Sequence, residues 1–217
     1  MYIYYPSCNF KRNFPQTAAR IADYLKTQPD VKIAGCCHVT NSLPKEGDVI
    51  VTVCMSCMRV LEEVRPDIPQ VNLFEFLLGR EDFAWPDYQG EAITLQDCFR
   101  ARGKHSLQDA MREAMKRMNM EVVELEPNRD EVIYDGSFLL HEAYPQNKKE
   151  APDYFDKYLS DYIHVLPKEE WLATYQEEAA KITTERTAGY CNVCVTSLRE
   201  GGANAHHLAE YAFPESR

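Results

Sequence analysis

The sequence lacks the features that mark membrane-spanning and nucleic-acid-binding proteins. No run approaches the roughly 18 apolar residues that a membrane helix needs, so we expect no membrane span. Acidic residues (34) outnumber basic ones (24), the net charge is −10, and no Lys/Arg run is long enough to track a phosphate backbone. We therefore expect no nucleic-acid partner. Glycine is scarce and forms no nucleotide-binding motif, so flavin or nicotinamide chemistry would have to come from a partner.

We also expect no secretory signal, because residues 1–6 contain neither a basic segment nor a long apolar one. We therefore expect a cytoplasmic protein. In that reducing compartment, eight cysteines are more typical of metal ligands or catalytic thiols than of a disulfide framework.

Short apolar runs alternate with amphipathic segments, which predicts an α/β fold with short parallel sheets. The expected strands are 2–5, 31–34, 48–53, 92–96, 121–125, 131–134 and 187–190. The expected helices begin at Pro15, near Cys57, at Asn72, after an N-cap at Ser106, near Cys194 and at Ala205. Loops at the carboxyl ends of parallel strands form the sites of such folds, and all eight cysteines fall at such ends.

The second half of the chain repeats the pattern of the first. Cys54-x-x-Cys57 matches Cys191-x-x-Cys194, and residues 72–76 match 207–211. Cys8 matches Cys98, and the strand before Cys36-Cys37 matches the strand before Tyr134-Asp135. An internal repeat predicts two βαβ-type lobes, 1–82 and 91–217, related by a pseudo-two-fold axis and joined by a linker at 83–90.

The first half contains five cysteines: Cys8, Cys36, Cys37, Cys54 and Cys57. A CxxC at a strand-to-helix turn lies near helix N–H groups, which favour the thiolate. A redox CxxC needs no further cysteines, and one zinc ion uses four at most. Five converging thiolates therefore favour a multi-iron cluster, with zinc and free thiols as the alternatives.

This cysteine spacing resembles the cysteine-rich CCG domain, which occurs twice in one subunit of heterodisulfide reductase and in related iron–sulfur oxidoreductase subunits of glycerol-3-phosphate and lactate oxidation. In the second half, residues 97–103 (DCFRARG) resemble the DPCHxARG-like start of that domain, and Asn128-Arg129-Asp130 resembles the segment before its second cysteine pair. The resemblance implies a noncubane [4Fe-4S] cluster on the five cysteines of the first half.

The chain departs from the family pattern at two points. His38 stands where the first motif has glycine, and Tyr134-Asp135-Gly136 replaces Cys-Cys-Gly in the second. The cysteines left in the second half are Cys98, Cys191 and Cys194. They could hold a different cluster or zinc, with Asp135 or His141 as the fourth ligand, or be reactive thiols without a metal.

By the resemblance, the protein is an iron–sulfur oxidoreductase that reduces a small disulfide or passes electrons on. Its electron-donating partner would be a flavoprotein or a ferredoxin-like protein. The alternative is a non-catalytic metal-binding module that senses redox state. His38 is the candidate proton donor at the substrate pocket, although it could also hydrogen-bond a cluster sulfur or simply lie in a loop.

Four further residues have two interpretations each. Arg100 and Arg102 could hold an anionic substrate or tune the cluster potential, or lie in a solvated loop. We expect His206 and His207 on a partly exposed helix face rather than as metal ligands.

Overall fold

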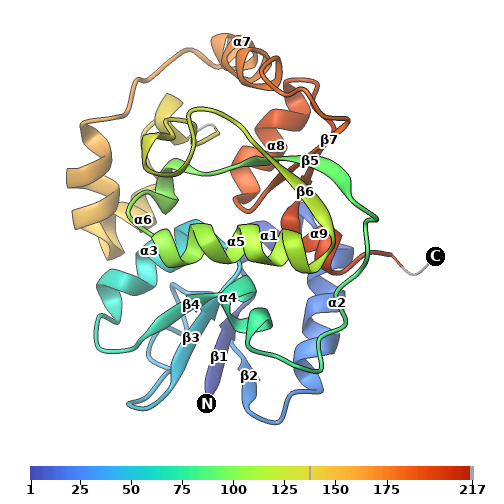
Figure 1. The fold of residues 1–217 in the computed structure, drawn as a ribbon. Helices are drawn as coiled ribbons and strands as arrows, with labels where there is room; N and C mark the ends of the chain where they lie inside the picture. Colours follow the sequence, from blue (N-terminus) through green and yellow to red (C-terminus); the bar gives the residue numbers. More distant parts are fainter. Residues whose placement is uncertain (137, 216–217) are drawn as a thin grey trace.

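The computed structural model describes residues 1–136 and 138–215 and consists of two four-stranded, all-parallel sheets flanked by helices (Figure 1). The first sheet has the strand order β2-β1-β3-β4, and the second has the order β6-β5-β7-β8. The strands are β1 (Tyr2–Tyr5), β2 (Val31–Ile33), β3 (Val49–Thr52), β4 (Gln70–Asn72), β5 (Glu91–Gln96), β6 (Met120–Glu124), β7 (Arg186–Gly189) and β8 (Ala205–His207). The predicted α/β class with two βαβ-type lobes is confirmed.

Helices cover the sheets, and α1, α5 and α9 lie between them (Figure 1). The α-helices are α1 (Cys8–Asn13), α2 (Pro15–Lys26), α3 (Met55–Val64), α4 (Leu73–Leu78), α5 (His105–Arg117), α6 (Pro145–Glu150), α7 (Lys168–Ala179), α8 (Asn192–Glu200) and α9 (Leu208–Ala212). Single turns η1 (Phe99–Ala101), η2 (Arg129–Glu131) and η3 (Phe138–Leu140) are 3-10 helices, and η4 (Asp153–Tyr158) is a π-helix.

The register of the strands places the cysteines equivalently in the two sheets. Thr52 of β3 pairs with Asn72 of β4, and Gly189 of β7 pairs with His207 of β8. Each CxxC therefore begins two residues after the equivalent strand position. The predicted placement of all eight cysteines beyond the carboxyl ends of strands is confirmed, because each follows β1, β2, β3, β5 or β7 in the chain.

The helix predicted from Ala205 is wrong in its first three residues, which form β8. His207 ends this strand and caps α9: its Nδ1 accepts from the Ala209 N–H, and Glu210 accepts from the His207 N–H. Asn72 and Glu75 make the same reciprocal cap at α4. His207 is consequently fully buried rather than on a partly exposed helix face.

Two predictions on the second lobe are also corrected. The strand predicted at 131–134 does not form, because Glu131 belongs to the 3-10 turn Arg129–Glu131 and residues 132–135 follow it without regular secondary structure. The predicted cap at Ser106 is wrong as well. Helix α5 begins at His105 after Lys104, and the Ser106 hydroxyl donates to the side chain of Glu75 on α4 instead.

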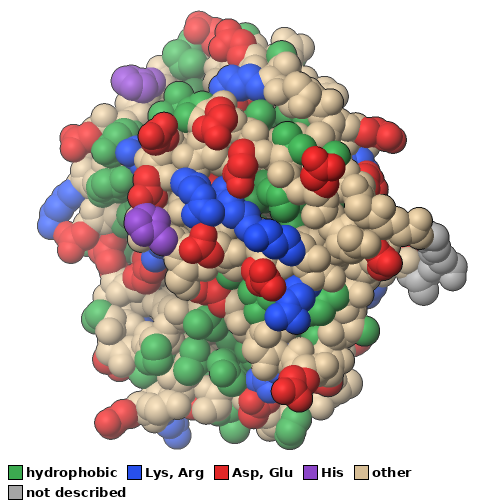
Figure 2. Space-filling view, viewed as in Figure 1, with side chains coloured by type: hydrophobic (Ala, Val, Ile, Leu, Met, Phe, Trp, Pro, Cys, Tyr) green, Lys and Arg blue, Asp and Glu red, His purple; other side chains and the backbone are tan. Residues whose placement is uncertain are grey.

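One hydrophobic cluster contains residues of both lobes, among them Phe10 and Ile21 of the first and Leu198 and Phe213 of the second. The linker is anchored to it, since the Phe83 ring packs edge-on against Tyr24 and Trp85 and lies tilted against Phe213. On the face shown in Figure 2, a short row of basic side chains is bordered by acidic ones. Within the described ranges, no helix is long and apolar enough to cross a membrane.

Candidate metal centres

The cysteines of the second lobe form a compact, buried ligand set. Cys98, Asp135, Cys191 and Cys194 each place one ligand atom within 4.8 Å of the other three. In a tetrahedral site with Zn–S bonds of about 2.3 Å, neighbouring ligand atoms lie about 3.8 Å apart, so the set fits around one ion. Within residues 1–136 and 138–215, no other group of metal-ligating side chains is this tight. These four residues could therefore hold a metal.

Of the two candidates for the fourth ligand, the structure places Asp135 at this site. Its Oδ1 lies 3.6 Å from the Cys98 sulfur, and its Oδ2 accepts a hydrogen bond from the Arg100 Nε at 3.1 Å. Both partners of the ion pair are fully buried. His141 is instead partly exposed and contacts the rings of Tyr144 and Trp171.

In the ligand set of the second lobe (the second set: Cys98, Asp135, Cys191 and Cys194), the pKa shifts favour a single thiolate, that of Cys191. Hydrogen bonds from Cys194 and Cys98, with the Arg100 charge, hold the pKa of Cys191 well below its usual range. Burial raises the pKa of Cys98 and Cys194. Burial also raises the pKa of Asp135 to about 7, although Arg100 opposes this shift. A bound cation would favour deprotonation of all four ligands.

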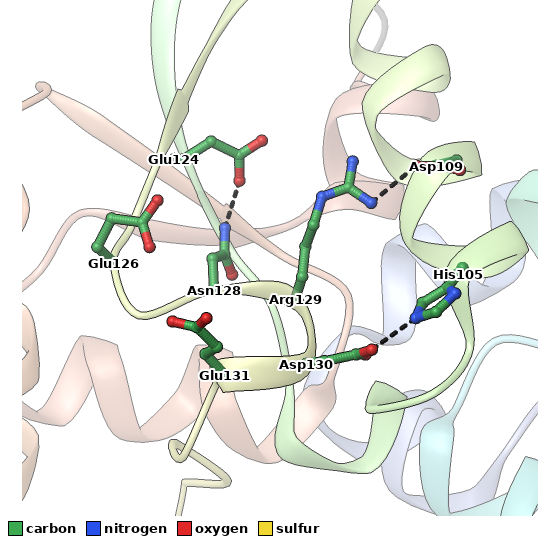
Figure 3. Close-up of a pocket in the computed structure, with 8 residues that line it drawn as sticks. All are labelled: His105, Asp109, Glu124, Glu126, Asn128, Arg129, Asp130 and Glu131. Atoms are coloured by element: carbon green, nitrogen blue, oxygen red, sulfur yellow. Dashed lines mark hydrogen bonds and ion pairs between the residues drawn. The ribbon is translucent and has the colours of Figure 1, made fainter.

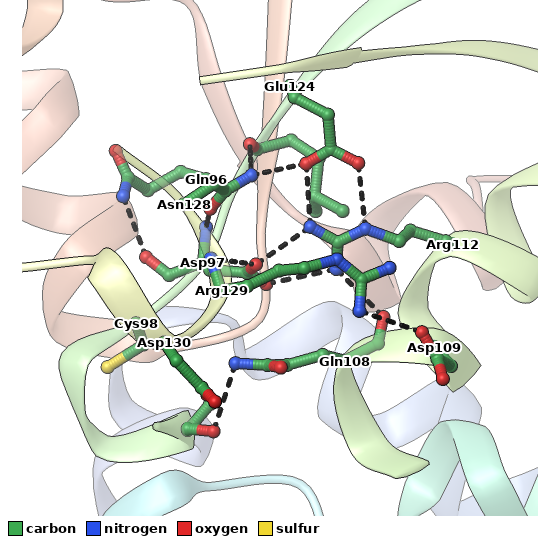
Figure 4. A network of polar contacts seen from close by, with 12 residues as sticks. Gln96, Asp97, Cys98, Gln108, Asp109, Arg112, Glu124, Asn128, Arg129 and Asp130 are labelled. Atoms are coloured by element: carbon green, nitrogen blue, oxygen red, sulfur yellow. Dashed lines mark hydrogen bonds and ion pairs between the residues drawn. The ribbon is translucent and has the colours of Figure 1, made fainter. Parts of the chain in front are cut away.

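A buried polar network around Asp97, beside Cys98, joins the end of β5 to β6 and α5 (Figure 4), and Tyr190 connects it to the end of β7. The Tyr190 hydroxyl donates to Asp97 at 2.6 Å and accepts the Cys98 backbone N–H at 3.4 Å. Arg112 donates to Asp97 at 2.8 Å and to Glu124 at 2.6 Å. Tyr190 directly precedes Cys191, so the network holds the first and second cysteines of the set in place.

The five cysteines of the first half surround a cavity instead of converging on a point. All five line a cavity of about 330 Å³, which Val193 of α8 also lines from the second lobe. Cys8 is exposed and Cys36 partly exposed, whereas the other three are buried. The sulfurs of Cys37 and Cys57 lie 3.4 Å apart. The set therefore has a buried floor and an accessible rim.

In both CxxC motifs the pKa of the first cysteine is lowered and that of the second is raised. A hydrogen bond from Cys57, with further ones from Ser7 and the Cys57 backbone N–H, lowers the pKa of Cys54 to about 6. A hydrogen bond with Cys57 also lowers the pKa of Cys37, while both contacts raise that of Cys57 itself. Near neutral pH, Cys54 therefore presents a thiolate suited to metal binding at the cavity, and the pKa of Cys37 is shifted in the same direction.

Polar side chains from the other half of the chain form part of the cavity rim. His38 lines the cavity, and its Nδ1 lies 2.6 Å from a carboxylate oxygen of Glu150 on α6. Tyr144 and Asn147, which precede Glu150, also line it. The Asn147 side chain is buried in this wall of the cavity.

The remaining candidates are not among the residues that line the cavity. Arg100 is fully buried, which excludes the solvated-loop interpretation for this residue. The Arg102 guanidinium lies 5.0 Å from the centre of the Phe99 ring. Burial lowers the pKa of His207 to about 3, so the imidazole is neutral. His206 makes a hydrogen bond to Asn204 at 3.0 Å.

A second, larger hollow of about 670 Å³ carries no comparable chemistry (Figure 3). Its lining is mostly acidic and contains no cysteine. Arg129 pairs with Asp109 at 2.8 Å, and His105 pairs with Asp130 at 2.5 Å, so part of its charge is already compensated.

Sequence reasoning missed the roles of Glu150, Asn147 and Asp97. Asp97 carried a signal, because a carboxylate beside a ligand at a strand end is typical of a group that orients a metal site. Glu150 and Asn147 carried none, since only the three-dimensional fold brings α6 to His38.

No protein-family model matches the sequence, and a search of curated proteins found no match. The geometry and chemistry of the two cysteine sets are therefore the basis for a functional conclusion.

Proposed function

We propose that the protein is an iron–sulfur oxidoreductase of the heterodisulfide reductase type, with a noncubane [4Fe-4S] cluster on Cys8, Cys36, Cys37, Cys54 and Cys57. One observation carries the proposal: cysteines from the ends of three neighbouring strands line a single cavity. The cavity would accommodate a multi-iron group, whereas a single ion would need the sulfurs drawn to one point.

The second set has the opposite character and would hold a single ion such as zinc. Its four ligands are buried and already lie close together, which suits a closed, four-coordinate structural site. The cavity, by contrast, has an exposed cysteine at its rim and can admit a substrate. Chemistry would therefore take place in the cavity, and the second site would stabilise the lobe beside it.

Reduction of a small disulfide to two thiols takes up two electrons and two protons. The cluster would supply single electrons, and a flavoprotein or ferredoxin-like partner would replace them. His38 stands at the cavity wall with Glu150 against its Nδ1, so its ring is held in one orientation. We assign to His38 the delivery of one proton to the leaving thiolate, and solvent at the exposed rim of the cavity would supply the second proton.

A non-catalytic redox-sensing module is the second candidate. The observation that favours it is the compact second set, which could act as a thiol-based metal site without turnover. A disulfide-reductase assay with a chemical electron donor separates the two functions. Turnover supports the enzyme, and loaded protein that reduces no disulfide supports the sensor.

Metal analysis of two matched variants tests the assignment of the sites. We expect anaerobically purified protein to contain about four iron atoms and visible sulfur-to-iron absorption. Cys37→Ser should lose the iron and the colour but keep zinc at the second set. Cys191→Ser should lose the zinc but keep the iron. Colourless, iron-free wild-type protein would contradict the proposal.

A further inference from the structure

A buried arginine joins the two cysteine sets. Arg100 has no exposed surface and ranks among the largest fully buried side chains of the described residues. Its Nε donates to Oδ2 of Asp135, a member of the second set. Its Nη1 donates to the hydroxyl of Ser56, which lies between Cys54 and Cys57 and lines the cavity of the first set.

The backbone around Arg100 is tied to the same helix. Arg59, one turn beyond Ser56 on α3, donates to the Arg100 carbonyl through Nε at 2.9 Å and through Nη2 at 2.6 Å. The Arg59 guanidinium lies 4.6 Å from the centre of the Tyr154 ring. The backbone and the side chain of Arg100 are therefore both bonded to α3, so we expect η1 and α3 to move together.

The two oxygens of Asp135 serve different neighbours. Oδ1 faces the Cys98 sulfur at 3.6 Å, on the side of the ligand set, whereas Oδ2 faces Arg100. The carboxylate can therefore bind an ion through Oδ1 without losing its bond to Arg100. An ion at the second set would restrict Asp135, and Asp135 would in turn restrict Arg100 and Ser56.

We propose that Arg100 is a positioning residue that couples the two sites, so that an ion at the second set orders the Cys54–Cys57 turn of the first. The inference rests on the proposed two-site arrangement. By thermodynamic reciprocity, loading of the first set would favour metal at the second by the same factor. Couplings of this kind typically amount to about 5- to 150-fold.

The coupling can be measured in iron-free, full-length protein, independently of whether the first set binds a cluster. The probe is Zn²⁺ alone, at about one equivalent, and the readout is the alkylation rate of each cysteine by peptide mass spectrometry. We expect Zn²⁺ to protect Cys98, Cys191 and Cys194 directly. It should also slow alkylation of Cys57 by about 10-fold, within the range given above.

Three variants distinguish this route from direct binding. Ser56→Ala should keep the protection of the second set but lose most of the protection of Cys57. Arg102→Lys, in the same loop but directed at the Phe99 ring, should behave like wild type. Cys98→Ser should abolish both effects, because it removes a ligand of the second set.

Three outcomes would overturn the proposal. The first is a Cys57 rate that does not respond to Zn²⁺ in the wild type. The second is equal protection of Cys57 in the wild type and in Ser56→Ala. The third is protection of Cys57 that survives in Cys98→Ser, which would mean that zinc binds the first set directly. None of these results bears on iron binding, so the proposed function would stand or fall separately.

Discussion

Asn72 and His207 occupy the same buried position in the two lobes, where the fourth strand of each sheet passes into a helix. Both accept the N–H of the residue two positions later, and both are followed three positions on by a glutamate that completes the cap. They differ in that only His207 can take up a proton. Burial lowers the pKa of His207 to about 3, against 6.5 in an exposed chain. At pH values between these two pKa values, His207 is therefore protonated in the unfolded state and neutral in the folded state.

We therefore expect the folded state to lose stability at His207 as the pH falls below about 6.5. The unfolded chain gains a proton there and the folded chain does not, so the loss is about 1.4 kcal/mol per pH unit. His207→Asn, the residue of the first lobe, should remove this part of the slope. Urea unfolding of the metal-free protein between pH 5 and pH 7.5 measures it.

The variant will have a lower overall stability, because the imidazole packs 4.8 Å from the Phe10 ring and asparagine does not fill that space. The comparison therefore rests on the pH dependence and not on the absolute free energy. Equal slopes in both proteins would show that His207 titrates normally in the fold.

For individual residues, the sequence predicted the chemical role of a side chain better than it predicted the neighbours of that side chain in the fold. The cysteines could be assigned to strand ends because thiol spacing is a local property of the chain. Asp135 was one of two candidates, and only the fold, which brings it to Cys98, decides between it and His141. The burial of Arg100 could not be predicted, because its hydrogen-bond partners Ser56 and Asp135 lie 44 and 35 residues away in the chain.

Among the helices, α7 and α8 make an unusually close contact at Gly201. This residue caps α8 with an ordinary φ of −72°, so its conformation does not require glycine. A Cβ atom there would lie 2.3 Å from the backbone oxygen of Tyr175 on α7. Space, and not backbone freedom, is what demands glycine at this position.

Gly201→Ala should therefore force α7 away from α8 and cost about 1–3 kcal/mol of unfolding free energy, as overpacking does. Gly79→Ala is the matched control, because Gly79 caps α4 at a φ of −84° and an added Cβ would be 3.5 Å from its nearest neighbour. Chemical denaturation of both variants gives the comparison. Similar losses in the two would contradict the steric argument.

The strands of the sheets were predictable because runs such as Val49–Thr52 are continuous and β-branched. Strands β4 and β8 were not, because each runs without a break into the helix that follows it, and the apolar spacing of that helix dominates the local pattern. Their ends nevertheless carried a signal: Asn72-x-x-Glu75 and His207-x-x-Glu210 have the spacing of a capping box and mark the first turn of α4 and of α9.

For the molecule as a whole, metal removal should lower the melting temperature. A ligand present at about 1,000 times its Kd adds about 4 kcal/mol to the stability of the state that binds it. Treatment with a chelator under reducing conditions should therefore destabilise the protein, and Zn²⁺ should restore it. Mg²⁺ should not, because it prefers oxygen ligands.

Differential scanning fluorimetry with metal analysis of each sample measures this response. Cys191→Ser serves as the control and should show no gain from Zn²⁺ at the second set. A melting temperature that does not depend on zinc in the wild type would favour unmetallated thiols there.

The identical strand order of the two sheets also bears on how such a chain could arise. Two separate copies of one lobe, paired about a two-fold axis, would carry every substitution twice. A difference such as that between Cys36-Cys37 in the first lobe and Tyr134-Asp135 in the second could not exist in such a pair. Fusion into one polypeptide removes that constraint, so the two halves can differ, as they do here, with five cysteines in the first lobe and three cysteines beside Asp135 in the second.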